Sequence, residues 1–172
     1  ALRLLKKDGF VLDAPGRGVL VAPLNVGWMV SVYQVRGALD ALAARLAAQQ
    51  RFAIDPKLIE HGRKAARGKN VKAMIEADLA FHNAIYQASG NPLITTLARQ
   101  YWGHLRRVMG AVLQATRQRD AVWDEHQAIP SAIAAGHADR AAALIDNHSQ
   151  QASGDLAERL SRVLQSQPGD KP

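Results

Sequence analysis

The chain has 172 residues, of which 48% are hydrophobic, and 22 lysines and arginines against 15 aspartates and glutamates give a net charge of +7. This composition is enough to bury the core of a folded domain. No apolar run approaches the roughly 18 residues of a membrane helix, and the charged start excludes a signal peptide, so we expect a cytoplasmic protein. Since there is no cysteine, disulfides and thiolate metal sites are excluded, and histidine and carboxylate remain as metal ligands.

Residues 1–24 have a different pattern from the rest of the chain. Leucines at helical spacing predict a short helix over residues 1–7, and two β-prone runs between residues 10 and 21 predict a hairpin. The turn between these runs carries the tip Gly16-Arg17-Gly18. A helix end followed by a hairpin is the second half of a winged-helix domain. We expect the sequence to be a fragment that begins inside the last helix of such a domain.

From residue 25 onward the pattern is helical throughout. Apolar residues recur at 3.6-residue spacing, and asparagine, proline and glycine mark where successive helices begin and end. The expected helices cover residues 25–50, 56–68, 70–88, 92–118, 120–135 and 136–165. Short connections make neighbouring helices antiparallel. We therefore predict an all-α fold: an antiparallel bundle of about six helices over residues 25–172, preceded by a partial winged-helix segment, residues 1–24, with a β-hairpin wing.

One pair of polar residues suggests a metal site. Asp78 and His82 lie one helical turn apart, so an oxygen and an imidazole nitrogen can face one ion from the same side of a helix. Polar groups against an apolar stripe must find partners, which a metal provides. His126 and His148 lie in later helices beside apolar positions that point inward. Three imidazoles and one carboxylate suit zinc, nickel, iron, manganese or cobalt better than calcium.

Two other interpretations remain open from these residues. A metal with an open coordination position can activate water, so the chain could be a small all-α metal-dependent hydrolase. Against this, Glu125 beside His126 is expected to point away from the ion, and no His-Glu-x-x-His helix is present. A metal-free helical interaction module would require scattered, exposed histidines. The basic residues between 57 and 72 are interpreted as a solvated helix face and not as a DNA-binding surface.

Several short motifs together resemble one known family, the FCD ligand-binding domain of FadR-type regulators in the GntR superfamily. Their order and spacing fit that domain: Asp78-x-x-Phe81-His82, Ala88-Ser89-Gly90-Asn91-Pro92, Glu125-His126-x-x-Ile129, and Gly136 with Ala141 and His148. Upstream, Tyr33-x-x-Arg36-x-x-Leu39-Asp40 is similar to the opening helix of the domain. Residues 2–11 and 15–21 look like the recognition-helix end and the wing of the attached DNA-binding domain.

The resemblance implies a metabolite-responsive bacterial transcription regulator, a homodimeric repressor that binds operator DNA and senses a small organic acid beside a bound metal. In metal-containing members one aspartate and three histidines hold the ion, and these fall on Asp78, His82, His126 and His148. Zinc is the first choice of metal. The ion is expected to hold the carboxylate of the effector, so the chain is expected not to be an enzyme.

Further residues are expected to contact the effector or DNA. Arg36 matches a position that often faces the pocket in the family, and Arg106 or Arg107 could add a bidentate grip on a carboxylate. Asn91 could reach the pocket, although capping a helix is its simpler role. At the wing, phosphate or the minor groove could be contacted by Gly16, Arg17 and Gly18.

Three positions depart from the family pattern without removing a metal ligand. Asp40 stands where glutamate is usual, His137 replaces the common aspartate after the glycine, and Pro130 replaces an aliphatic residue. Proline has no N–H to return to the carbonyl of His126. We therefore expect the helix to bend beside His126 and Pro130 to reshape the wall of the pocket.

Overall fold

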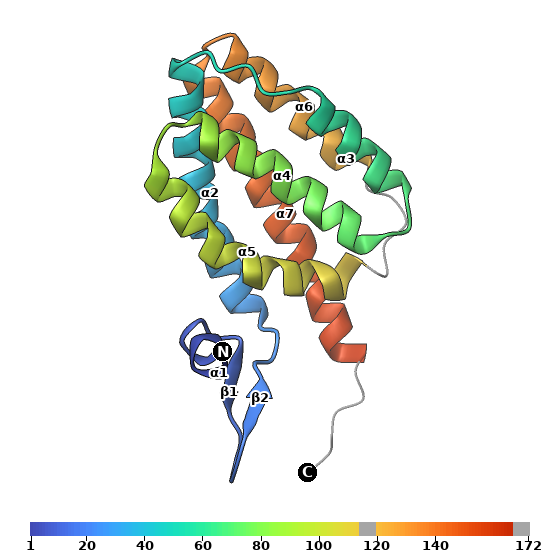
Figure 1. Cartoon of the computed structure of the whole chain (residues 1–172). Helices are drawn as coiled ribbons and strands as arrows, with labels where there is room; N and C mark the ends of the chain where they lie inside the picture. Colours follow the sequence, from blue (N-terminus) through green and yellow to red (C-terminus); the bar gives the residue numbers. More distant parts are fainter. Residues whose placement is uncertain (114–119, 167–172) are drawn as a thin grey trace.

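The protein is a helical bundle with a small hairpin at one end (Figure 1). The computed structural model describes residues 1–113 and 120–166. The bundle consists of α2 (Val26–Gln49), α3 (Lys57–Arg67), α4 (Val71–Ala88), α5 (Pro92–Val112), α6 (Asp120–Ala134) and α7 (Ala138–Ser166). The all-α prediction is confirmed. The helix expected over residues 92–118 corresponds to α5, and the expected continuation from 114 onward lies outside the described residues.

Local sequence signals explain where these helices begin and end. The side chains of Asn25, Asn70 and Asn91 each accept a hydrogen bond from a backbone N–H in the first turn of α2, α4 and α5. Such bonds satisfy N–H groups that have no partner within the helix. Gly90 and Gly136 follow the ends of α4 and α6 with φ of 69° and 77°, a left-handed conformation that glycine adopts without steric cost.

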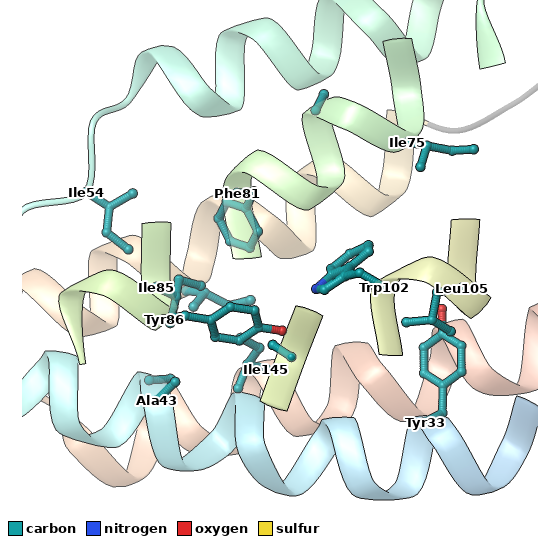
Figure 2. Packing of buried hydrophobic residues seen from close by; sticks show 14 of the residues in the cluster. Tyr33, Ala43, Ile54, Ile75, Phe81, Ile85, Tyr86, Trp102, Leu105 and Ile145 are labelled. Carbon is teal, nitrogen blue, oxygen red and sulfur yellow. The ribbon is translucent and has the colours of Figure 1, made fainter. Parts of the chain in front are cut away.

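The most extensive helix–helix contact among the described elements joins α2 to α7. The buried face of α2 is rich in alanine, and Ala43, Ala44, Ala47 and Ala48 are fully buried there. Small side chains at a helix contact allow the two axes to approach closely. Larger core residues, among them Phe81, Ile85, Trp102 and Leu105, come from α4 and α5 (Figure 2). The centre of the bundle is therefore reached by side chains from several helices at once.

The N-terminal segment, residues 1–24, contains α1 (Leu2–Lys7), β1 (Val11–Asp13) and β2 (Val19–Val21). The strands are antiparallel, with Val11 opposite Val21. Gly16 and Gly18 at the tip have φ of 97° and 108°, so the turn depends on residues without a Cβ. The segment lies at the end of the bundle where α2 begins (Figure 1). None of the described helices is long and apolar enough to cross a membrane.

Candidate metal centre

Four side chains from three helices converge in the bundle. Asp78 and His82 lie one turn apart on α4, while His126 comes from α6 and His148 from α7. One possible ligand atom of each residue lies within 4.8 Å of those of the other three. His82 and His126 are completely buried, His148 is nearly so, and Asp78 is the most exposed of the four. The structure thus brings together the four residues that the sequence suggested as ligands.

The spacing of these atoms fits a small metal ion. Nε2 of His126 lies 3.2 Å from Nε2 of His148 and 3.5 Å from Oδ1 of Asp78, and Nε2 of His82 lies 3.9 Å from the same oxygen. A tetrahedral zinc ion with bonds of about 2.0–2.1 Å holds its ligand atoms roughly 3.3–3.4 Å apart. Small side-chain adjustments would be enough to close the set around an ion.

Hydrogen bonds to two of the imidazoles favour the tautomer that a metal needs. Nδ1 of His148 lies 2.8 Å from a carboxylate oxygen of Glu125, so Nδ1 carries a hydrogen, and in the neutral ring the lone pair is then on Nε2. Nε2 of His82 accepts a hydrogen bond of 2.7 Å from Arg36, whereas its Nδ1 lies 3.4 Å from Asp40 without forming a hydrogen bond. Carboxylates behind ligating histidines are typical of metal sites, where they fix the orientation of the ring.

Glu125 has a role that the sequence did not reveal. Its side chain was expected to point away from the ion, and it is not among the four converging groups. Its carboxylate instead reaches from α6 to His148 on α7. The two residues are 23 positions apart, so no local pattern signals the contact. Because this carboxylate is engaged by His148, the structure does not support Glu125 as the general base of a hydrolase.

Arg36 lies beside the four candidate ligands and is buried. Its Nη2 donates to His82, and its Nε donates to Asp40 at 3.1 Å. The guanidinium also lies 4.7 Å from the centre of the Trp102 ring and 5.2 Å from that of Tyr33. An ion pair combined with two aromatic rings explains how a charged arginine is held inside the bundle.

Asp40, the residue that departs from the family's usual glutamate, has its carboxylate well satisfied. Besides the bond from Arg36 it accepts hydrogen bonds from the hydroxyl groups of Tyr86 and Ser149. These donors come from α4 and α7, while Asp40 itself lies on α2. The carboxylate therefore ties three helices together next to His82.

Burial controls the protonation of the site. Loss of hydration lowers the pKa of His82 and His126 well below the usual value, and the nearby Arg36 charge lowers both further. Burial raises the pKa of Asp78 and Asp40, although Arg36 opposes both shifts. Burial also raises the pKa of Tyr33 to about 12. The imidazoles of His82 and His126 are therefore held neutral, which is the form that binds a metal.

The other residues suggested for the effector have different surroundings. The Asn91 side chain caps α5 by accepting a hydrogen bond from the N–H of Leu93. Arg106 pairs with Glu76 at 3.2 Å on the surface. Arg107 donates to the carbonyl of Ala22, next to the hairpin. Of the suggested effector residues, Arg36 is the one that contacts a candidate metal ligand.

Two further expectations concern the wing and Pro130. Gly16, Arg17 and Gly18 form the exposed tip of the hairpin. Pro130 lies inside α6, as expected. It lines a surface groove shared with residues of α3 and the preceding loop, and α6 continues through it from Asp120 to Ala134, so the bend beside His126 stays a prediction.

Comparison with known proteins agrees with this architecture. The sequence profile of the FCD domain matches residues 31–151. McbR/YncC of E. coli has a similar structure, with a TM-score of 0.80, 18% identity, and coverage of 91% of this chain and 77% of that one. A putative GntR transcriptional regulator from Rhodococcus sp. RHA1 gives a TM-score of 0.69 at 20% identity, covering 97% and 78% of the two chains.

A GntR family regulator from Pseudomonas syringae pv. tomato str. DC3000 has a TM-score of 0.63 at 17% identity and covers 94% of this chain and 69% of its own. A comparison with curated protein sequences finds no match. At such low identities, the structural likeness is one of fold. The matched profile covers most of the chain and includes all four converging residues, so the chain belongs to the FCD domain family and shares the fold of GntR-family regulators.

Proposed function

We propose that the chain is a cytoplasmic, metabolite-responsive transcription repressor that acts as a homodimer. In this proposal residues 25–172 hold a divalent metal and a small organic acid, and residues 1–24 are the end of a winged-helix domain that binds operator DNA. The observation that carries the proposal is the convergence of Asp78, His82, His126 and His148 within 4.8 Å. Membership of the FCD family and the regulators of similar fold support it.

The donor set suits zinc first, with nickel, manganese, iron or cobalt as alternatives. Three neutral imidazoles and one carboxylate bind such ions well, and no thiolate is available to change the preference. With four protein ligands of total charge −1, a divalent ion leaves a centre of net charge about +1. When bound, the metal would supply a positive contact for the carboxylate of an effector. The protein contributes the shape of the site and a second cation.

Arg36 is that second cation. Its Nη2 donates to Nε2 of His82, the same nitrogen that faces the other ligand atoms. That nitrogen has one lone pair, so it can serve either Arg36 or a metal. Metal ligation by His82 would therefore release Nη2 for an effector carboxylate, while the bond from Nε to Asp40 keeps the guanidinium in place.

The DNA-binding part of the proposal depends on the N-terminal segment. The tip with Gly16, Arg17 and Gly18 is exposed and able to approach a phosphate or the minor groove. In a homodimer, a shift of the bundle on effector binding would alter the distance between the two winged-helix domains. The affinity for a two-fold operator would change with it.

Metal binding by the full chain tests the central claim. We expect isothermal titration calorimetry and elemental analysis to give one zinc per chain, and alanine at Asp78, His82, His126 or His148 to weaken zinc binding by about a hundredfold or more. His137→Ala is the matched control, because His137 is exposed and outside the cluster. Full zinc retention by all four variants would contradict the proposal. Ester or phosphoester turnover that depends on these residues would favour the hydrolase instead.

A further inference from the structure

A cavity of about 310 Å³ is lined by residues of α4 and α5, some of them next to the candidate metal ligands in the sequence. Its polar lining residues are Asn83, Gln87, Thr95, Arg99 and Arg106. On α4, Asn83 directly follows the ligand His82, and the lining residue Leu79 directly follows Asp78. Neighbouring residues on a helix point about 100° apart, so the cavity adjoins the face of α4 that carries the ligands.

Trp102 completes the wall between the cavity and the metal centre. Its side chain lines the cavity, yet its ring also lies 4.7 Å from the Arg36 guanidinium and 5.6 Å from the His82 ring. One indole therefore contacts both compartments. Displacement of this ring would join the cavity to the space around Arg36 and the candidate ligands.

No well-formed hydrogen bond fixes the indole. Trp102 is only 4% exposed, and its Nε1 has no partner within normal hydrogen-bond geometry, although the indole N–H is close enough to the Tyr86 hydroxyl to lower the pKa of that group. Figure 2 shows this nitrogen turned towards the Tyr86 hydroxyl, which itself donates to Asp40. A buried N–H that lacks a well-formed hydrogen bond costs free energy, so a movement that brings Nε1 to an acceptor on a ligand would provide a stronger hydrogen bond.

The two arginines that line the cavity, Arg99 and Arg106, form no strong ion pair among the described residues. Arg99 is exposed and has no ion-pair partner in residues 1–113 and 120–166. Arg106 pairs with Glu76, but both side chains are more than 40% exposed, and such pairs contribute little to stability. Both guanidinium groups are available to a ligand that carries its own carboxylate.

We propose that this cavity is a second compartment of the effector site and that the effector is a dicarboxylic acid. The inference rests on the proposed function, because one carboxylate is assigned to the metal and Arg36. The second carboxylate lies in the cavity, where Arg99 and Arg106 bind it and Asn83, Gln87 and Thr95 hydrogen-bond the ligand. Trp102 moves aside to let the molecule span the wall.

The test measures the binding of two acid series to the zinc-loaded full chain by calorimetry. Succinate, glutarate and adipate are compared with the matched monocarboxylates butyrate, valerate and hexanoate. We expect the best dicarboxylate to bind at least about tenfold more tightly than its monocarboxylate, the effect of one charge-assisted contact. Arg99→Ala and Arg106→Ala should each reduce that advantage several-fold and leave monocarboxylate binding unchanged. Arg140→Ala, at an exposed arginine on α7, is the control.

Glu76 offers a change in the opposite direction. Its carboxylate competes with the ligand for Arg106, so Glu76→Gln should tighten dicarboxylate binding and leave monocarboxylate binding as it was. A purely structural role of the Glu76–Arg106 pair would not produce tighter binding. A dicarboxylate should also change tryptophan fluorescence in the unaltered chain, and this change should be absent in Trp102→Phe.

The outcomes separate this inference from the function on which it rests. Equal affinities for both acid series, or equal losses for both series in Arg99→Ala, would overturn the second compartment and leave a metal-dependent acid sensor. Acid binding that persists in His126→Ala without zinc, or no acid binding by the zinc-loaded chain, would overturn the proposed function and the second compartment together. A dicarboxylate preference that is lost in Arg99→Ala and increased in Glu76→Gln supports both.

Discussion

The centre of the bundle and the N-terminal segment are stabilised in different ways. At the centre, Arg36, Asp40 and His82 are buried and bonded to one another. In the N-terminal segment α1 has no buried residue, and both strands are half-buried or exposed. The stability of the centre depends on buried polar groups that are hydrogen-bonding partners of one another, so removal of one partner affects the whole network. The segment depends on a few contacts with α5, which can be broken one at a time.

Those contacts are specific and few. His104 on α5 stacks on Phe10 with ring centres 4.3 Å apart, and its Nε2–H donates to the carbonyl of Asp8 at 2.8 Å. Trp28 also packs against His104, with ring centres 4.2 Å apart. Arg107 adds its bond to the Ala22 carbonyl. Since little else of the segment is buried, we expect it to separate from the bundle more readily than the bundle unfolds.

The largest effect is expected at Asp40. Asp40→Ala leaves the buried Arg36 guanidinium without its carboxylate and should lower the free energy of unfolding by about 3–5 kcal/mol. Urea denaturation measures this change. Asp139→Ala is the matched control, because the Asp139–Arg45 pair is largely exposed and should have little effect. If the two variants were equally stable, the buried network would not be what stabilises the centre.

A smaller and more local effect is expected from two glycines of α5. A Cβ at Gly103 would lie 2.6 Å from the Phe10 ring, whereas one at Gly110 would meet nothing within 4 Å. Gly103→Ala should weaken docking of the N-terminal segment by about 1–3 kcal/mol through this overlap. Gly110→Ala should instead stabilise the bundle by roughly 0.5–1 kcal/mol.

Hydrogen exchange of residues 1–24, measured beside the thermal midpoint of the bundle, separates the two effects. Gly103→Ala should accelerate exchange in the segment while the midpoint hardly changes. Unchanged exchange in the segment would show that Phe10 adjusts without leaving α5.

The smallest effect is a pH dependence at His104. Burial lowers the pKa of His104 below 6.5, although its bond to the Asp8 carbonyl opposes the shift. When the segment is undocked, His104 is easier to protonate. The contribution of His104 to the free energy of docking is therefore present above pH 6.5 and is lost as the pH falls below that value. Limited proteolysis at Lys6 and Lys7 should show wild type more protected than His104→Gln above pH 6.5. That difference should shrink at lower pH, and a constant difference would contradict the assignment.

Much of the fold could be predicted because its signals are local. Asn25, Asn70 and Asn91 start helices where the sequence suggested, and Gly90 and Gly136 end them. The pairing of Asp78 with His82 was also readable, because both lie on one helix a turn apart. The positions of His126 and His148 beside that pair followed from a family resemblance combined with apolar neighbours.

Contacts between distant positions could not be predicted in the same way. The bond from His148 to Glu125, the position of Trp102 over Arg36 and the bond from Arg107 to Ala22 all depend on how helices and loops pack. Arg106 and Arg107 are adjacent in sequence yet contact a helix carboxylate and a linker carbonyl respectively. Adjacent residues point about 100° apart around the helix axis, and this difference decides which partner each side chain meets. The amino-acid composition does not predict which elements lie in each direction.

Trp102, Gly103 and His104 are consecutive residues on α5, and their contacts lie on different sides of that helix. Trp102 contacts Arg36 and His82 in the core, while His104 holds Phe10 and the Asp8 carbonyl of the N-terminal segment. Two residues correspond to about 200° around an α-helix, so the two side chains project almost oppositely from one rigid axis. A rotation of α5 about its axis would displace the indole and the imidazole together. The packing of Trp102 in the core and the stacking of His104 on Phe10 therefore depend on the same orientation of α5.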